Sequence, residues 1–134
     1  MTAIFDASVV VKWFVRDPLT PAAQQARTQW PRPAAPSILT VEVANAFRRY
    51  VIKGDLDADL AIRSLDVITR VIRTADHRPM LEDAFLMACR KNHSMQDCVY
   101  AVMAVREGLP LVTADKKMAN KLSDVEGLDL RLIA

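Results

Sequence analysis

The sequence is poor in cysteine and contains no long hydrophobic run. Its two cysteines, Cys89 and Cys98, are too few and too far apart in the chain for a zinc site. Both fall at apolar positions of expected helices, so we expect buried free thiols in a protein of a reducing compartment. No apolar run approaches the roughly 18 residues that cross a bilayer, and the N-terminus lacks the basic segment of a signal peptide. The sequence therefore predicts a soluble cytoplasmic protein that does not cross a membrane.

The length of the chain sets the number of domains. With 134 residues, of which 51% are hydrophobic, it can form one domain with its own core and is short for two. We therefore expect a single domain spanning residues 1–134. The 18 basic and 16 acidic residues give a net charge of +2, which by itself favours no class of partner.

Short apolar segments alternate with amphipathic ones along the chain. Strands are expected at residues 2–5, 73–75, 109–113 and 128–133. Helices are expected to begin near Ser8, Pro21, Ile38, Asp57, Pro79, Ser94 and Asp115. The stretch from Pro31 to Pro36 is expected to be a connector. Short buried strands that alternate with helices favour a parallel sheet with helices on both faces.

Four carboxylates stand where an apolar strand-like or loop segment gives way to a helix: Asp6, Glu42, Asp97 and Asp115. In an open α/β sheet, ligand sites form beyond the carboxyl ends of the strands, so residues far apart in sequence can meet there. Carboxylate oxygens are the ligands that hard divalent cations prefer. The placement is therefore compatible with an acidic metal site.

Helix capping is an ordinary explanation for the same four acids. Helix N-termini attract carboxylates because their free N–H groups and the macrodipole favour negative charge. Asp6 and Asp115 could be plain N-caps, and Ser94 with Asp97 resembles a capping box. Glu42 could simply complement the dipole of its helix. From the residues alone, both interpretations stay open.

Basic residues outnumber acidic ones once the four candidate acids are set aside. The remaining 12 acids then face 18 bases, an excess of six positive charges that favours a polyanionic ligand. Candidates for gripping phosphates lie on two expected helices: Arg48, Arg49 and Lys53 on one, and Lys116, Lys117 and Lys121 on the other. A solvated helix face explains each of them equally well.

Four segments together resemble a known family. They are Ile4 to Ser8, Val41 to Asn45, Ser94 to Ala101, and Leu111 to Lys117, each containing one of the four acids. In order and spacing they are similar to the four signatures of PIN-domain ribonucleases, and most of all to those of VapC-type toxins of bacterial toxin-antitoxin pairs. The resemblance covers essentially the whole chain.

The resemblance implies a three-layer α/β/α sandwich with a five-stranded, mostly parallel sheet. It also implies a metal-dependent endoribonuclease that uses Mg²⁺ or Mn²⁺. Position by position, Asp6, Glu42, Asp97 and Asp115 match the catalytic, metal-binding acidic quartet. Asp6 and Asp97 are the expected direct ligands, while Glu42 and Asp115 would act through water or hold a second ion.

Several further positions bear on the implied site. Ser8 and Thr113 match supporting hydroxyl positions, whose ordinary roles would be capping and a buried hydrogen bond. Many relatives carry another acid near the last signature, whereas Lys116, Lys117 and Met118 follow Asp115 here and the next acid is Asp124. This departure weakens the case for a second metal ion. His77 and His93 are expected to be a loop residue and a helix-flanking residue without a catalytic role.

The resemblance also implies partners. These are an RNA substrate, a second copy of the chain in a homodimer, and a cognate antitoxin that lies across apolar helices near the active site. Three other hypotheses compete. The first is a PIN fold kept only as an RNA- or protein-binding module. The second is a receiver-like phosphoacceptor domain, which would need adjacent acids after the first strand, where Asp6 stands between Phe5 and Ala7. The third is a phosphatase of the haloacid-dehalogenase type, which would need a second Asp at Ser8.

Overall fold

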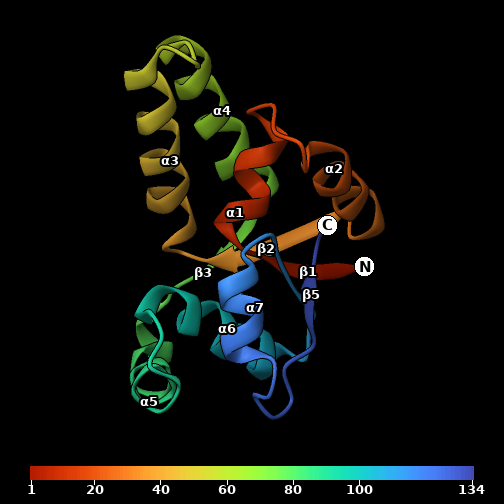
Figure 1. The fold of residues 1–134 in the computed structure, drawn as a ribbon, viewed down its shortest axis with the longest axis vertical. Coiled ribbons are helices and arrows are strands. Elements are labelled where there is room, and N and C mark those ends of the chain that lie inside the picture. Colours follow the sequence, from red (N-terminus) through yellow and green to blue (C-terminus); the bar gives the residue numbers. More distant parts are fainter.

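Five short strands form one parallel sheet in the computed structural model, which describes residues 1–134 (Figure 1). They are β1 (Thr2–Phe5), β2 (Arg32–Pro36), β3 (Arg73–Ala75), β4 (Leu111–Thr113) and β5 (Leu130–Leu132). Their order is β3-β2-β1-β4-β5, and every neighbouring pair is parallel. The register pairs Phe5 with Val112, so the residues that follow β1 and β4 emerge side by side at one edge.

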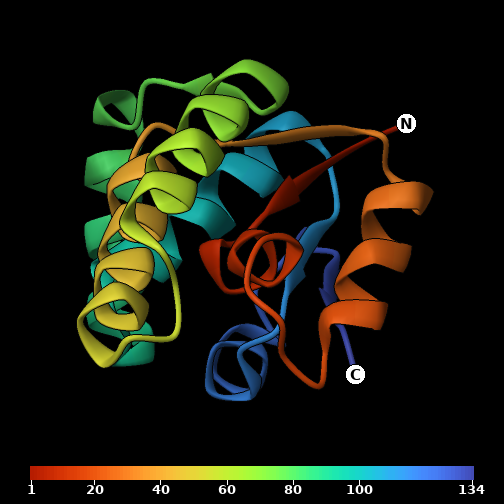
Figure 2. The same cartoon turned by 90° about the horizontal axis from the view of Figure 1, so that it is seen from above.

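Helices cover both faces of this sheet. On one side lie α1 (Ala7–Val10), α2 (Thr20–Gln29), α3 (Leu39–Lys53) and α4 (Ala58–Val71); on the other lie α5 (Leu81–Lys91), α6 (Met95–Glu107) and α7 (Lys116–Leu122) (Figure 1). Two short 3₁₀ helices, η1 (Val11–Trp13) and η2 (Arg78–Met80), extend α1 and precede α5. Seen from above, α1 lies between α2 and the α3–α4 pair (Figure 2). The expected three-layer α/β/α sandwich with a five-stranded sheet is confirmed.

The helices follow from their apolar spacing and their ends. In α3 the buried residues Val43, Ala46 and Phe47 share one face. The helix stops at Gly54, whose φ of +85° is a left-handed conformation that favours glycine. In contrast, α6 is buried along most of its length and contacts both β1 and β2. This burial fixes the position of any side chain that α6 carries to the edge of the sheet.

The expectation of a connector from Pro31 to Pro36 is wrong, because residues Arg32–Pro36 form β2. The strand pairs with β1 and β3, with Ala34 and Ala35 fully buried at its centre. Proline lacks an N–H and is disfavoured inside sheets, which is why the segment resembles a turn in sequence. The hydrogen bonds Arg32 N to Met1 O (3.2 Å) and Ser37 N to Ala75 O (2.7 Å) extend the pairing at both ends.

One expectation about the core also needs correction. Cys98 is buried as expected, but Cys89 is exposed, and both are free thiols. The apolar residues of α5 are only partly covered: Ala84 is buried, while Leu81 and Phe85 are exposed. No helix is both long enough and apolar enough to cross a membrane.

Candidate active site

The four candidate acids stand at the starts of four helices. Asp6 directly follows β1 and is the N-cap of α1, and Asp115 follows β4 and is the N-cap of α7. Glu42 lies in the first turn of α3, and Asp97 in the first turn of α6. The fold thus brings segments from both ends of the chain to the carboxyl edge of the sheet, where ligand sites of such folds form.

Asp6 is buried and is held by two hydroxyl groups. Ser8 Oγ donates to Asp6 Oδ2 at 2.6 Å, and Thr113 Oγ1 donates to the same oxygen at 2.9 Å. Each hydroxyl in turn accepts a backbone N–H: Ser8 from Ala114 at 3.0 Å and Thr113 from Asp115 at 3.0 Å. Ser8 and Thr113 therefore fix the first acid and also join the β1–α1 turn to the β4–α7 turn.

Glu42 is held by a buried phenol that the sequence analysis did not single out. Tyr100 Oη donates to Glu42 Oε1 at 2.7 Å, and the Tyr100 side chain has no solvent exposure. The two residues are 58 positions apart in sequence and belong to α3 and α6, on opposite faces of the sheet. The position of the Glu42 side chain is therefore set by this hydrogen bond and not by the dipole of α3 alone.

Asp97 is held by His93, which was expected to be only a helix-flanking residue. His93 Nε2 lies 2.6 Å from Asp97 Oδ2, and only 6% of the His93 side chain is exposed. Because an ionised carboxylate can only accept, the imidazole N–H is the donor. Ser94 Oγ does cap α6 by accepting from Asp97 N at 3.3 Å. The Asp97 side chain, however, is paired with His93, so the capping box is only half formed.

Asp115 combines the capping role with a place in the site. Its Oδ1 accepts from the backbone N–H groups of Lys117 and Met118 at 2.9 and 3.2 Å, so the expected N-cap is confirmed. The side chain also borders an open, wholly polar pocket of about 350 Å³. The lining residues are Asn92, His93, Ser94, Asp97, Asp115 and Lys117.

Burial and mutual repulsion raise the pKa values of two of the acids. Loss of solvent is the main reason for the raised pKa of Asp6; the negative charges of Asp97 and Asp115 raise it further, against the hydrogen bonds from Ser8 and Thr113. Burial likewise raises the pKa of Glu42 to about 7, and the charges of Asp6 and Asp97 add to this effect. The four acids thus influence one another electrostatically.

The donor set suits a hard divalent cation. No group of three His, Cys, Asp or Glu side chains lies close enough together to hold a metal ion by itself. Magnesium does not require one, because it keeps several waters and binds through one or two carboxylates together with substrate phosphate. Each acid also keeps one oxygen without a protein partner. These oxygens are Asp6 Oδ1, Glu42 Oε2, Asp97 Oδ1 and Asp115 Oδ2.

None of these four oxygens is sealed in the core. Every buried side-chain nitrogen or oxygen has a hydrogen-bond partner. An oxygen without a partner on one of these partly buried residues must therefore reach solvent. The residues present fit a metal that takes oxygen ligands and water.

The structure separates the basic candidates. Lys117 lines the pocket beside Asp97 and Asp115, whereas Arg48, Arg49 and Lys116 are exposed and do not line it. None of the four forms an ion pair within the chain. Asp124, the next acid after Asp115, pairs with Lys91 at 2.5 Å and does not line the pocket.

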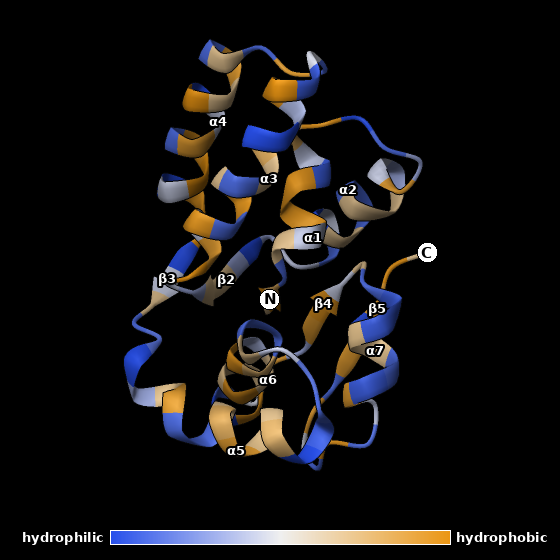
Figure 3. Ribbon diagram, turned by 60° about the vertical axis from the view of Figure 1, so that its left-hand side comes forward, coloured by the Kyte–Doolittle hydropathy of each residue, from blue (hydrophilic) through white to orange (hydrophobic).

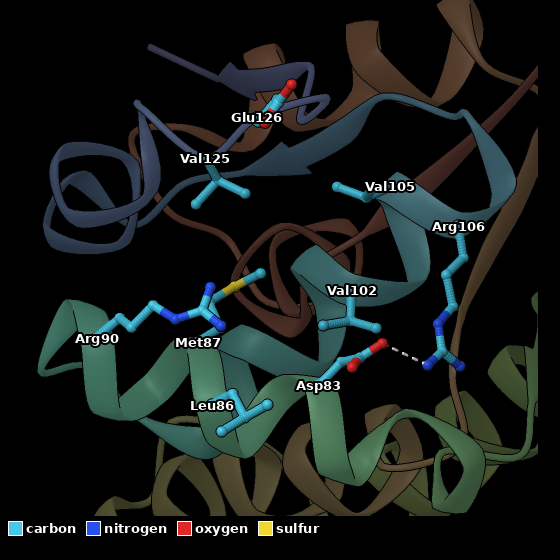
Figure 4. A pocket seen from close by; sticks show the side chains of 9 residues that line it. All are labelled: Asp83, Leu86, Met87, Arg90, Val102, Val105, Arg106, Val125 and Glu126. Carbon is cyan, nitrogen blue, oxygen red and sulfur yellow. Dashed lines mark hydrogen bonds and ion pairs between the residues drawn. The ribbon is translucent and has the colours of Figure 1, made fainter.

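A second pocket lies away from the four acids. It occupies about 290 Å³ between α5, α6 and the loop at Val125 and Glu126 (Figure 4). The Asp83–Arg106 ion pair, at 2.7 Å, borders it, and Leu86 and Val105 supply apolar walls. Because it contains none of the predicted site residues, it belongs to a different surface of the molecule.

Tyr100 and His93 left only weak signals in the sequence. Tyr100 follows Asp97 by three positions in an otherwise apolar helix, so a buried phenol there implies a hidden hydrogen-bond acceptor. His93 precedes Asp97 by four positions, one helical turn away, but it lies before the N-cap and resembles a flanking loop residue. Neither spacing identifies its partner without the tertiary structure.

Comparisons with known proteins find similar sequences. A family model described as PIN domain matches residues 3–122. Ribonuclease VapC3 of Pyrobaculum aerophilum is 25% identical over 124 residues, which are 90% of this chain and 95% of that protein. Ribonuclease VapC1 of Mycobacterium tuberculosis is 30% identical over 86 residues, 63% of this chain and 64% of that protein.

Solved structures share the fold. A toxin-antitoxin complex from Klebsiella pneumoniae contains a chain with a TM-score of 0.72 and 17% identity, covering 94% of both chains. The structure of PAE2754 from Pyrobaculum aerophilum has a TM-score of 0.72 and 22% identity, covering 97% of this chain and 89% of the other.

Proposed function

This chain belongs to the PIN-domain family, and from that premise we propose that it is a metal-dependent endoribonuclease toxin neutralised by a cognate antitoxin. The observation that carries the proposal is the position of Asp6, Glu42, Asp97 and Asp115 at one edge of the sheet, each held by its own hydrogen-bond donor. We further propose that the nuclease is one domain, residues 1–134, and that it acts on RNA in the cytoplasm. The two VapC relatives are named as ribonucleases, which supports the same activity here.

Mg²⁺ is the proposed cofactor, with Mn²⁺ as an alternative. A bound divalent ion lowers the pKa of a coordinated water and offsets charge on the phosphate oxygens of the RNA. Asp6 and Asp97 are the proposed direct ligands, while Glu42 and Asp115 act through water or hold a second ion. Ser8 and Thr113 orient Asp6, because both hydroxyls donate to the same carboxylate oxygen. The other oxygen, Asp6 Oδ1, is thereby held in one orientation.

The basic residues are proposed to bind RNA phosphates at different distances from the cut. Lys117 lines the polar pocket beside Asp97 and Asp115, so its ammonium group can reach a phosphate next to the cut. Arg48, Arg49 and Lys116 are exposed and free of ion pairs, so they suit phosphates farther along the strand. Unpaired loops are the favoured RNA targets, because their bases are accessible to side chains.

The surface also supports protein partners. The α3–α4 hairpin extends beyond the sheet and contains both hydrophobic and hydrophilic residues along its length (Figure 3). Its exposed apolar residues include Val41, Ile52, Ile62 and Val67. We propose that the antitoxin binds across these helices. We also propose that two copies of the chain form a homodimer. Two structural neighbours are described as a toxin-antitoxin complex and as VapBC2 of Rickettsia felis, which agrees with a partner of this kind.

The proposal is tested by incubating partner-free protein with total RNA, with Mg²⁺ or with chelator, and mapping new 5′ ends. We expect new ends at defined positions with Mg²⁺ and none with chelator. The alternative is a catalytically idle PIN fold that binds RNA or protein, for which Mg²⁺ would create no new ends. A receiver-like phosphoacceptor would instead retain label from a small phosphodonor, and its failure to cut RNA would also contradict the proposal.

A further inference from the structure

Tyr100 and His93 occupy comparable positions behind two of the acids. Tyr100 Oη donates to Glu42 Oε1 at 2.7 Å, and His93 Nε2 lies 2.6 Å from Asp97 Oδ2. Both side chains are almost completely buried, so neither is free to turn away from its carboxylate. Each contact therefore commits one oxygen of the acid to the protein and leaves the other available.

The number of free oxygens limits how each acid can bind a cation. A strong donor on one carboxylate oxygen occupies one of its lone pairs and fixes the orientation of the group, so it disfavours chelation of an ion by both oxygens. Ca²⁺ commonly takes six to eight oxygen ligands at about 2.3–2.6 Å, often with a bidentate carboxylate. Mg²⁺ takes six at about 2.0–2.1 Å in a regular octahedron, for which single carboxylate oxygens and waters suffice.

We propose that Tyr100 and His93 are positioning residues that restrict Glu42 and Asp97 to one metal-binding oxygen each, and that the site thereby favours Mg²⁺ and Mn²⁺ over Ca²⁺. The inference rests on the proposed function, because it assumes that these acids bind metal. It assigns a role to a phenol and an imidazole that touch neither metal nor substrate. Hydrogen-bond partners of metal ligands commonly act in this way, by fixing the orientation of the ligand.

The same rule applies to the other two acids by different means. Both hydroxyl bonds to Asp6 end on Oδ2, and both backbone bonds to Asp115 end on Oδ1. All four acids therefore offer one oxygen each, although the donors are hydroxyls, a phenol, an imidazole and backbone amides. Tyr100 and His93 are the informative members, because their side chains form no hydrogen bond to the backbone. The side chains of Ser8, Thr113 and Asp115 do.

The test is metal binding by the full-length, partner-free protein, measured by calorimetry with Mg²⁺, Mn²⁺ and Ca²⁺. Tyr100→Phe keeps the ring in the core and removes only the donor. We expect it to weaken Mg²⁺ and Mn²⁺ binding about 10-fold and to narrow the preference over Ca²⁺. The matched control is Tyr50→Phe, because Tyr50 is half-buried on α3 and its hydroxyl forms no hydrogen bond within the chain. This control should bind all three ions as the wild type does.

His93 is tested by a pair of variants. His93→Ala should lower Mn²⁺ affinity and change the electron paramagnetic resonance spectrum of bound Mn²⁺. His93→Gln should restore part of both, because its amide N–H can donate where the imidazole did. Thermal unfolding of each metal-free variant shows whether it is folded. If His93→Ala is unfolded, the comparison of Tyr100→Phe with the wild type still tests the inference.

The outcomes separate this inference from the proposed function. A wild-type protein that binds none of the three ions overturns the proposed function itself. A wild-type protein that binds them, together with a Tyr100→Phe variant of unchanged Mg²⁺ affinity and unchanged Mg²⁺ to Ca²⁺ ratio, overturns the positioning role alone.

Discussion

Asp6 is both buried and required as a charged group in the proposed site. It is 6% exposed, yet it must be available as a charged ligand. The hydroxyls of Ser8 and Thr113 stabilise that charge, while burial and the neighbouring acids oppose it, and the net effect is a raised pKa. A divalent cation would offset the remaining cost, so at the residue scale the site is arranged for an ion.

The support of Asp6 can be removed with little change in shape by Thr113→Val. The valine keeps the volume but removes a donor to Asp6 and an acceptor for Asp115 N–H. We expect a loss of about 1–3 kcal/mol in the free energy of unfolding, measured by denaturant titration, because buried groups lose their partners. RNA cleavage should fall as well. Thr69→Val on the exposed face of α4 is the control and should change neither; full activity in Thr113→Val would show that Asp6 does not need this support.

Glu42 gives the metal-free protein a pH dependence. Its pKa is raised from 4.5 to about 7, so the folded state binds this proton more tightly than the unfolded state. The resulting stability is fully present below pH 4.5 and is lost as the pH rises through about 7. The raised pKa of Asp6 acts in the same direction.

We therefore expect the denaturant concentration at the midpoint of unfolding, measured without metal, to decrease as the pH is raised from 5 to 8. In Glu42→Gln the fall should be smaller, because Gln can still accept from Tyr100 and carries no charge. Equal pH dependence in the wild type and Glu42→Gln would contradict the assignment.

At the scale of elements, the sequence predicts helices better than strands. Apolar spacing, Gly54, Asp57 and Ser94 mark where helices begin and end, and the structure agrees at each of them. The strand β2 was missed because Pro33, Ala34, Ala35 and Pro36 lack the branched side chains that usually signal a strand. Its pairing comes from β1 and β3, which are distant in sequence.

A prediction at this scale concerns the start of α4. Asp57 Oδ2 accepts from Leu60 N at 3.2 Å and caps the helix away from the acidic site. Asp57→Ala should lower the free energy of unfolding by about 1 kcal/mol and leave metal binding unchanged. Asp59→Ala in the same turn removes a charge without removing a cap. It should therefore lower the free energy of unfolding by only a few tenths of the amount expected for Asp57→Ala. Equal losses in both variants would show that the capping bond adds nothing.

At the scale of the whole molecule, the fold gathers acids that lie more than a hundred residues apart. The four positions could be predicted from the sequence because their surrounding motifs are local. Tyr100 could not be identified as the partner of Glu42, because that contact depends on how α6 packs beneath the sheet. His93 was not identified as the partner of Asp97 because it precedes the N-cap of α6 and resembles a flanking loop residue. The exposure of Cys89 was not predicted either, because periodicity does not show which part of an apolar face is covered.

Metal should also stabilise the molecule as a whole. A ligand that binds only the folded state raises stability by RT ln(1 + [L]/Kd), about 2.7 kcal/mol at a concentration of 100 Kd. The unfolding temperature should therefore rise steadily with added Mn²⁺. Asp6→Asn should abolish most of this rise. Asp124→Asn should not, because Asp124 pairs with Lys91 and is not one of the four acids of the site. An identical rise in both variants would place the metal elsewhere.

The most direct test of the account is the rate of RNA cleavage at a mapped site by wild-type protein and by Asp6→Asn, both partner-free and both shown to be folded. The account predicts cleavage by the wild type that requires Mg²⁺ or Mn²⁺ and stops with chelator. It predicts a loss of at least about 100-fold in Asp6→Asn, because a ligand of the ion is removed. Cleavage at the wild-type rate by Asp6→Asn, or in the presence of chelator, would contradict it.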